Sequence, residues 1–342
     1  MVDELWVGNM QNPGLQWEKT AAYDIGLDFG MFNNVLSGTI EAYKGKTTNL
    51  LVNRSLPDLT GFANIETNLG QIDNKGLEIT LNTHNISHPN FSWNTSFNFS
   101  LNRNKIVHLY GTMVNITDSS GKIIGQKEAS DIRNHWFIGH AIHSIWDAKA
   151  TGIYQTDEAA EAAKYGKKPG DFKVQDVNGD GKITDADRQF LGYSTPRFRW
   201  TLYNDFTFYK NFDLSVMIYS YWGQMGTFNR AKNDYSFPDR VNSYVYPYWT
   251  PENPENSFAR LYSSDGGASY SVYRKKSFIR LDNVALGYTF PNRLLHKASI
   301  QALKVYFTVK NAGFYAPDWD NWDPENGGPT PRTFVLGLNM TL

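Results

Sequence analysis

The chain has 342 residues, no cysteine and a formal net charge of −1, so its composition excludes disulfides and gives no electrostatic reason to expect a nucleic-acid partner. Aromatic residues make up 15% of the chain, yet the mean hydropathy is −0.49, and no apolar run approaches the roughly 18 residues of a membrane helix. Hydropathy averages do not reveal a strand that crosses a membrane, because such a strand alternates apolar and polar residues.

Apolar and polar residues alternate along much of the chain, which predicts β-strands with two unlike faces. The alternation is sharpest in FSWNTSFNFSLN, residues 91–102, where aromatic side chains dominate one parity and Ser and Asn fill the other. The parity of the apolar residues changes near Asp282, which predicts a β-bulge. Nine strands of about 9–11 residues are predicted in chain order, near residues 23–31, 36–43, 77–82, 91–102, 198–208, 212–218, 279–290, 303–309 and 334–342.

The predicted connections between these strands are alternately short and long. The short ones are residues 32–34, 85–90, 210–211 and 291–301, and the long ones are residues 52–75, 105–197, 223–277 and 314–332. In an up-and-down sheet, alternate connections lie at the same end, so one end carries tight turns and the other carries long loops. Short periplasmic turns and long extracellular loops are the layout of a bacterial outer-membrane barrel. Residues 1–19 would be the tail of another long outer loop.

The two faces of the strands distinguish a membrane barrel from a soluble β-sandwich. In a sandwich, the aromatic side chains of residues 91–99 would form a core between two sheets. The opposite face carries Asp, Glu, Ser, Asn and Thr in nearly every strand, which is too polar for a packed interior. The sequence therefore favours an all-β fold, an antiparallel up-and-down transmembrane β-barrel with lipid on the apolar face and water on the other. Because nine strands would leave two open edges, we expect residues 1–342 to be the C-terminal part of a larger barrel.

Several ordered blocks of the sequence resemble the C-terminal barrel of the SusC/RagA family of TonB-dependent transporters. The resemblance covers nearly the whole chain. The blocks are NPGLQWEKTAAYDIGLDFGMFNNVLSGTIEAYKGKTTNLL (12–51), DVNGDGKITDADRQFLGYSTPRFRW (176–200), YKNFDLSVMIY (209–219), YWTPENPENSFARLY (248–262), SFIRLDNVALGYTFP (277–291) and TPRTFVLGLNMTL (330–342).

The resemblance implies a 22-stranded barrel filled by an N-terminal plug. It also implies a SusD-like surface lipoprotein as partner, outer-membrane lipid around the barrel, and import of an oligosaccharide (glycan) or peptide substrate driven by the TonB–ExbB–ExbD complex. A signal peptide, a TonB box, the plug domain and the first half of the barrel are not found in this sequence. The last residue, Leu342, departs from the aromatic residue that typically ends such barrels.

The stretch DVNGDGKITDAD, within the predicted long loop 105–197, has the register of an EF-type calcium loop. Calcium takes six to eight oxygen ligands, and such a loop supplies them from positions 1, 3, 5, 7, 9 and 12. Gly181 falls at position 6, where the chain must turn sharply. An acidic turn without an ion is the alternative interpretation, and Asp replaces the usual Glu at the last position. The predicted calcium ligands are Asp176, Asn178, Asp180, the carbonyl of Lys182, Thr184 and Asp187.

The two long connections nearest the C-terminus are rich in aromatic residues. Flat aromatic rings at a wet surface can stack on sugars or on a partner protein. Long loops also use such rings to build their own small cores, and we expect this for most of them. The predicted substrate contacts are Trp249, Trp319 and Trp322.

No motif of a known enzyme class emerges from the sequence. A nucleophile elbow, a P-loop and a dinucleotide-binding glycine pattern are all missing. His140 and His143 would point to opposite faces of a strand and make a poor metal pair. Three functions are compatible with parts of this sequence: a transporter, a soluble calcium-stabilised β-sandwich that binds carbohydrate, and an outer-membrane enzyme. The transporter, which is not an enzyme, explains the alternation, the loop asymmetry and the family blocks together.

Overall fold

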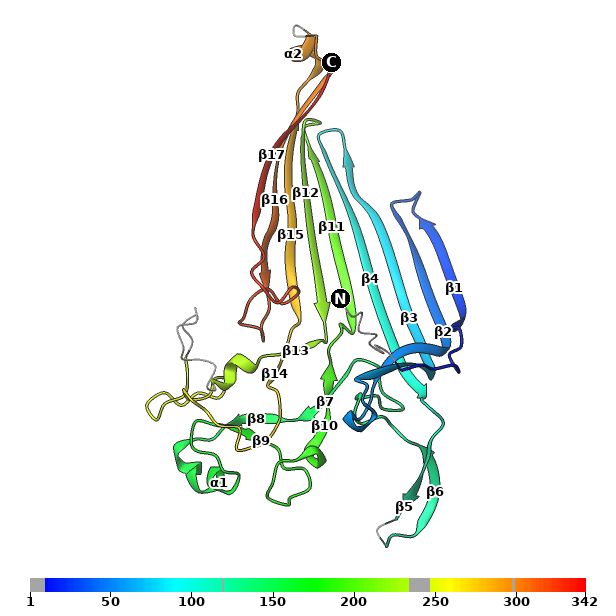
Figure 1. Cartoon of the computed structure of the whole chain (residues 1–342). Helices are drawn as coiled ribbons and strands as arrows, with labels where there is room; N and C mark the ends of the chain where they lie inside the picture. The colour runs from blue at the N-terminus through cyan, green and yellow to red at the C-terminus, as the bar shows by residue number, and fades with distance from the viewer. Residues whose placement is uncertain (1–9, 119, 234–246, 297–298) are drawn as a thin grey trace, which may run out of the picture. The chain divides into compact units, whose positions relative to one another are not determined.

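The computed structural model describes residues 10–118, 120–233, 247–296 and 299–342. Its main element is one nine-stranded sheet with the order β1-β2-β3-β4-β11-β12-β15-β16-β17 (Figure 1). Every neighbouring pair in this sheet is antiparallel, and each strand pairs with the sheet strand that precedes or follows it along the chain. The predicted up-and-down antiparallel arrangement is thus confirmed, and the described residues do not form the two packed sheets of a sandwich.

The bounds of the nine strands place them close to the predicted positions. They are β1 (Lys19–Met31), β2 (Leu36–Ser55), β3 (Asn64–His88), β4 (Phe91–His108), β11 (Phe198–Phe208), β12 (Phe212–Trp222), β15 (Phe278–Thr289), β16 (Ala302–Tyr315) and β17 (Thr333–Thr341).

Two expectations about strand length need correction. Strands β2 and β3 are 20 and 25 residues long, well beyond the expected membrane length. They remain paired from Leu36↔Thr83 to Ser55↔Asn64, so the predicted long loop 52–75 is mostly strand, with only residues 56–63 as the connection. Apolar and polar residues alternate less clearly in residues 52–75, so the sequence does not mark this segment as strand. The backbone hydrogen bonds between the two strands continue there, because they do not depend on which side chains are present. The remaining connections keep the predicted alternation of short and long.

The register brings side chains of one kind together on each face of the sheet. One row across six strands reads Phe29, Gly38, Leu81, Phe97, Leu202 and Ile218. Aromatic rings on this face contact each other across strands, as in Trp93–Phe206, with centroids 5.7 Å apart, and Phe198–Trp222, with centroids 6.2 Å apart. Because the side-chain period of a strand is two, this register puts most hydroxyls and amides on the other face. Thr95 and Asn204 are exceptions on the apolar face, where Thr95 Oγ1 donates to Asn204 Oδ1 at 2.7 Å.

The predicted bulge is present in β15. Leu281 pairs with Ile218 and Asn283 with Met217, so Asp282 is the extra residue between them. The pairing of β15 with β16 shifts at the same point, where Leu281 lies opposite Gly313 and Asn283 opposite Lys310. The bulge explains why the apolar parity changes within one continuous strand.

The chain divides into two compact units. Unit 1 contains residues 1–142, 196–222 and 277–342, and unit 2 contains residues 143–195 and 223–276. Unit 1 holds the nine-stranded sheet, together with η1 (Asp58–Thr60), β5 (Met113–Thr117), β6 (Ile123–Glu128) and α2 (Asn292–Leu295). Unit 2 holds β7 (Ser144–Ala148), β8 (Ala150–Ile153), η2 (Thr156–Glu158), α1 (Ala159–Lys164), β9 (Phe172–Val174), η3 (Asp185–Asp187), β10 (Arg188–Tyr193), β13 (Met225–Thr227), η4 (Asn229–Lys232) and β14 (Tyr273–Lys275).

Each unit has buried side chains of its own. In unit 1 a cluster of Leu69, Ile72, Ile106 and Leu109 is buried where β3 and β4 extend toward the long connections, and Trp136 packs against it. In unit 2 the largest fully buried apolar side chains include Phe228 and Ile153. No helix among the described residues is long and apolar enough to cross a membrane.

Candidate functional site

One face of the nine-stranded sheet of unit 1 carries many polar side chains and is a candidate functional surface. Polar side chains of this face join by hydrogen bonds, which are Thr39 Oγ1 to Asp28 (2.6 Å), Thr80 Oγ1 to Asn98 (3.0 Å) and Ser96 Oγ to Asn82 (2.6 Å) between neighbouring strands, and Asn102 Nδ2 to Tyr43 (2.6 Å) across β3. Such groups both donate and accept, so a face made of them can exchange hydrogen bonds with water and with polar solutes.

A tyrosine on this face needs a glycine beside it. The Tyr43 ring covers Gly76 on the adjacent strand, and a Cβ built on Gly76 would lie 2.3 Å from Tyr43 Cζ. The same pairing recurs at Tyr306 and Gly337, where the distance to Cζ is 2.4 Å. The glycines therefore let large polar rings lie flat against the sheet.

The long connection 316–332 is fastened to the sheet by a buried ion pair. Arg280 on β15 donates from Nη2 to both carboxylate oxygens of Asp323, each at 2.7 Å, and both residues are almost completely buried. Glu325 accepts a 2.6 Å hydrogen bond from Tyr219. Burial alone would raise the pKa of Asp323, but hydrogen bonds from Arg280 and from the backbone outweigh it and hold the pKa below its ordinary value.

The three tryptophans predicted to contact substrate differ in exposure. Trp249 in unit 2 is 6% exposed and its Nε1–H donates to Gln155 Oε1 at 2.9 Å. Trp319 in unit 1 is also 6% exposed and donates to the carbonyl of Trp322. Trp322 is 43% exposed and is the one that offers a ring surface to solvent. Substrate contact by any of the three stays a prediction, and residues 234–246, with other aromatics of that loop, lie outside the described part of the chain.

The predicted calcium loop is folded around its own carboxylates. Asp176 accepts the N–H groups of Gly179 at 2.7 Å and Gly181 at 2.8 Å. Asp187 is fully buried and accepts the N–H groups of Val177 and Thr184, both at 2.8 Å. Within the described residues, no group of three or more His, Cys, Asp or Glu side chains converges tightly enough to hold a metal ion. The candidate ligand atoms are all hard oxygens, which matches the chemistry of calcium. In this structure the same carboxylate oxygens accept hydrogen bonds from backbone N–H groups.

Unit 2 contains a buried cluster of charges next to this loop. Lys167 is 4% exposed, donates to the carbonyl of Phe172 at 2.8 Å and lies over the Tyr270 ring. Lys232 donates to Asp265 at 2.6 Å and lies over the same ring. Burial lowers the pKa of Lys167 to about 8, although the charges of Asp265 and Asp171 oppose this shift.

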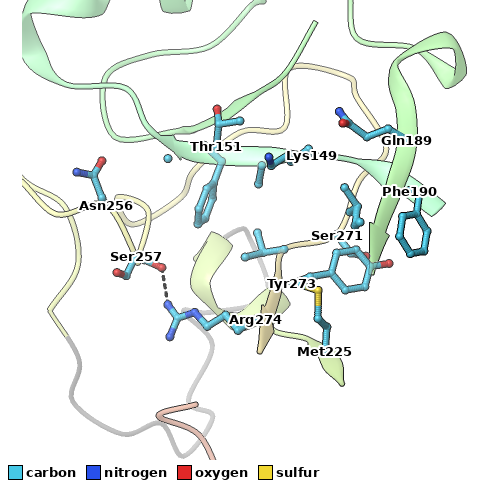
Figure 2. A pocket seen from close by; sticks show the side chains of 15 residues that line it. Lys149, Thr151, Gln189, Phe190, Met225, Asn256, Ser257, Ser271, Tyr273 and Arg274 are labelled. Atoms are coloured by element: carbon cyan, nitrogen blue, oxygen red, sulfur yellow. Dashed lines mark hydrogen bonds between the residues drawn. The ribbon is translucent and has the colours of Figure 1, made fainter. Parts of the chain in front are cut away.

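Unit 2 also contains a cavity of about 400 Å³, which sequence reasoning did not find (Figure 2). Both segments of the unit contribute to it, because its lining combines β8, β9 and β10 with β13 and β14. Its walls combine apolar rings with hydroxyls, amides and cations. The lining residues belong to short segments far apart in the chain, and no local motif joins them. Those that Figure 2 labels are Lys149, Thr151, Gln189, Phe190, Met225, Asn256, Ser257, Ser271, Tyr273 and Arg274.

Comparison with known proteins gives a consistent result for nearly the whole chain. No protein-family model matches it. TonB-dependent receptor P3 of Formosa agariphila is 31% identical over 360 residues, which cover 96% of this chain and 34% of the relative. The TonB-dependent receptor SusC of Bacteroides thetaiotaomicron is 30% identical over 362 residues, covering 96% of this chain and 32% of SusC. The chain thus spans about a third of the length of the curated relatives that it matches.

Solved structures agree on the fold. The structure of the RagAB peptide transporter superposes with a TM-score of 0.73 at 22% identity, covering 97% of this chain and 36% of that one. The RagAB peptide importer in its closed-closed state gives a TM-score of 0.72. The relatives are receptors and not enzymes, and they belong to the outer membrane. The strand order, the two faces and the relatives therefore agree that this chain belongs to the SusC/RagA type of TonB-dependent outer-membrane receptors.

Proposed function

We propose that the protein imports a polar nutrient across the outer membrane, and that the nine strands form part of the barrel wall. The observation that carries the proposal is the register of the sheet, which puts an apolar row such as Phe97–Leu202–Ile218 on one face. Hydrogen-bonding side chains occupy the other face. A wall between lipid and a wet lumen needs this division.

The cargo would be an oligosaccharide or a peptide. The hydroxyls and amides of the polar face suit a solute with many donors and acceptors, and the relatives include SusC and the RagAB peptide transporter. By analogy with this type of receptor, a SusD-like lipoprotein would cover the long connections, and the TonB–ExbB–ExbD complex would supply energy through a plug domain. The strands of unit 1 would be the fixed wall past which that plug moves.

Uptake measurements in the source bacterium test this function. Deleting the codons for residues 19–342 from the chromosomal gene should abolish energy-dependent uptake of one labelled oligosaccharide or peptide, and the complete gene should restore it. A strain that carries only residues 1–342, with no plug supplied from elsewhere, should not transport. Uptake by that strain, or uptake that survives the deletion for every cargo tried, would contradict the proposal.

We also propose that the loop of residues 176–187 binds one calcium ion through its side-chain oxygens and the carbonyl of Lys182. The support is the complete set of oxygen donors at the EF-type positions, together with turns at Gly179 and Gly181, where φ is +74° and +79°. Asn178 and Asp180 are already joined at 3.0 Å, so the donors of the first half lie close together. A carboxylate oxygen that accepts one N–H retains a lone pair for a cation.

Metal analysis of the purified protein at millimolar calcium should find one calcium ion per chain, and a chelator should lower the melting temperature of unit 2. Asp180→Ala should remove the ion. Asp157→Ala is the control, because Asp157 is an exposed carboxylate of unit 2 outside the loop. No bound calcium in the parent, or equal loss in both variants, would refute a calcium site.

A further inference from the structure

The apolar face of the sheet changes character toward the long-connection end of β1 to β4. Residues that lie opposite each other on neighbouring strands form rows across this face, and successive rows on one face are two residues apart along each strand. Two successive rows are apolar and read Leu27–Ile40–Ile79–Phe99 and Ile25–Ala42–Leu77–Leu101. The next two rows read Tyr23–Lys44–Lys75–Arg103 and Ala21–Lys46–Asp73–Lys105. The same face therefore turns from apolar to basic from one row to the next.

The basic rows begin where a membrane strand of ordinary length ends. The stretch of β4 from Phe91 to Leu101 pairs with the whole of β11, which is 11 residues long, and about 9–11 residues cross a bilayer. Tyr23 shares a row with the first cations and is 79% exposed, as in the aromatic girdles that mark the edge of the apolar band. The long connections leave the strands at this end, which makes it the extracellular end (Figure 1). The basic rows thus lie at the level of the headgroups of the outer leaflet.

Four lysines of these rows, which we call the basic patch, have no counter-charge among the described residues. The patch consists of Lys44, Lys46, Lys75 and Lys105, all of them exposed. None of the four takes part in the ion pairs or side-chain hydrogen bonds of the described part of the chain. The one carboxylate in the two rows, Asp73, accepts a 2.6 Å hydrogen bond from Gln71 Nε2. Positive charge therefore dominates this part of the face.

Two lysines of the basic patch lie directly opposite each other, Lys44 on β2 and Lys75 on β3. Like charges in this position destabilise a sheet, so the pair is favourable only with an anion beside it. Arg103 follows in the same row, and its guanidinium donates to the backbone carbonyls of Asn102 and Arg197. Carbonyls do not neutralise a charge, so Arg103 adds to the positive potential while the four lysines remain available to a ligand.

The basic patch is confined to adjacent strands and to one end of them. Toward the short turns, the rows of the same strands carry neither Lys nor Arg and read Phe29–Gly38–Leu81–Phe97 and Met31–Leu36–Thr83–Thr95. On the next strands of the sheet, the same face ends toward the long connections in Phe198, Trp222 and Ile279. Lysines that only keep the ends of strands in water would be expected at both ends. The confinement therefore favours one localised anionic ligand.

We propose that the basic patch binds a phosphate-bearing lipid of the outer leaflet. The phosphate would lie between Lys44 and Lys75, and the acyl chains would lie along the apolar rows that contain Ile25 and Leu27. Each lysine presents three donors, and hydrogen bonds between charged groups are among the strongest. The apolar rows add contacts that a free phosphate ion cannot make. The inference rests on the proposed barrel wall, because only that wall places this face in lipid.

Native mass spectrometry of the complete protein in a neutral detergent tests the inference by counting the lipids that remain bound. The probes are diphosphoryl lipid A and phosphatidylglycerol, which are anionic, zwitterionic phosphatidylcholine, and inorganic phosphate. At least one anionic lipid should bind about tenfold more tightly than phosphatidylcholine, because basic side chains near a membrane surface attract anionic lipid. Lys44→Gln with Lys75→Gln should abolish this preference. Lys44→Arg with Lys75→Arg retains both charges and should preserve it.

Lys122→Gln with Lys127→Gln is the matched control, because it removes the same charge from exposed lysines of the β5–β6 hairpin. It should leave the preference unchanged. Without lipid, the melting temperature of Lys44→Gln with Lys75→Gln should not fall, since the change removes a like-charge pair.

Three results would overturn the inference: no preference for either anionic lipid in the parent, equal loss in both Gln double variants, or displacement of the lipid by inorganic phosphate at equal concentration. Cysteine labelling of the two faces of β11 tests the barrel wall separately. Absence of the lipid preference together with water-accessible labelling on the polar face alone would refute the basic patch and leave the wall standing.

Discussion

Ser96 and Phe97 are neighbours in β4 that serve opposite faces of the sheet. Ser96 donates to Asn82 at 2.6 Å on the polar face, whereas Phe97 lies in the apolar row between Leu81 and Leu202. Phe97→Arg would place a charge in hydrocarbon and should cost roughly 2–4 kcal/mol near the membrane midplane. Ser96→Arg faces water and should cost much less. Urea unfolding in detergent or lipid vesicles measures both, and equal costs would show that the faces are assigned wrongly.

Lys167 gives unit 2 a distinctive pH dependence. Its pKa is about 8 in the folded protein, whereas a free lysine has a pKa near 10.4. Between these values the unfolded chain binds more protons than the folded protein, so the free energy of unfolding rises with pH. The charges facing Lys167 are Asp171, Asp265 and Lys232. Burial raises the pKa of Tyr270, so its ionisation in the unfolded chain opposes the rise only near pH 10 and above.

The effect of Lys167 on the free energy of unfolding is therefore best measured between pH 8 and 9.5. The free energy of unfolding should rise by roughly 1–2 kcal/mol over this interval in the parent and remain flat in Lys167→Met. Lys168→Met, at the exposed neighbour, should retain the rise. Pulse proteolysis in urea, scored at sites within residues 143–195, measures the difference. The same slope in both variants would mean that Lys167 keeps an ordinary pKa.

At the scale of elements, the Arg280–Asp323 pair decides whether the connection 316–332 stays on the sheet. Asp323→Asn leaves the buried guanidinium with Glu325, 3.7 Å away, as its remaining carboxylate, and should cost at most roughly 3–5 kcal/mol. The segment should then open locally while the sheet persists, because the pair is not part of the strand ladder. Hydrogen exchange of residues 316–332 should speed up in Asp323→Asn and stay unchanged in Asp318→Asn, which alters an exposed carboxylate of the same loop. Equal protection in both variants would show that other contacts hold the loop.

Elements differ in how far their sequence determines them. The strands were predictable because each alternates with period two, and even the bulge at Asp282 left a visible change of parity. The extension of β2 and β3 was not predictable, because backbone hydrogen bonds continue the pairing where the alternation of the sequence weakens. Contacts such as Arg280–Asp323 join residues 43 positions apart in different elements, and no local pattern records them. The cavity of unit 2 was not predictable for the same reason, because its lining residues come from short segments that only the fold brings together.

For the whole molecule, the proposed transport function requires that one face of the nine-stranded sheet contacts lipid and the other contacts water. Among the described strands, β1 and β17 each pair on one side alone, so a closed wall would need further strands beside them. A closed wall has water inside and lipid outside, and the nine strands carry suitable side chains for both. Unit 2, with its cavity and its proposed calcium loop, would have a role in transport only if this division is correct.

Cysteine accessibility measures the division most directly, because the chain has no cysteine of its own. Single cysteines would replace Thr201 and Asp205 on the polar face of β11, and Leu202 and Phe206 on its apolar face. The complete protein in outer-membrane vesicles would be treated with a water-soluble maleimide, with labelling in denaturant as the reference for each variant. If the polar face contacts water, labelling should be strong at positions 201 and 205 and weak at positions 202 and 206. Equal labelling at all four positions, or the reverse pattern, would contradict a barrel wall with its polar face toward water.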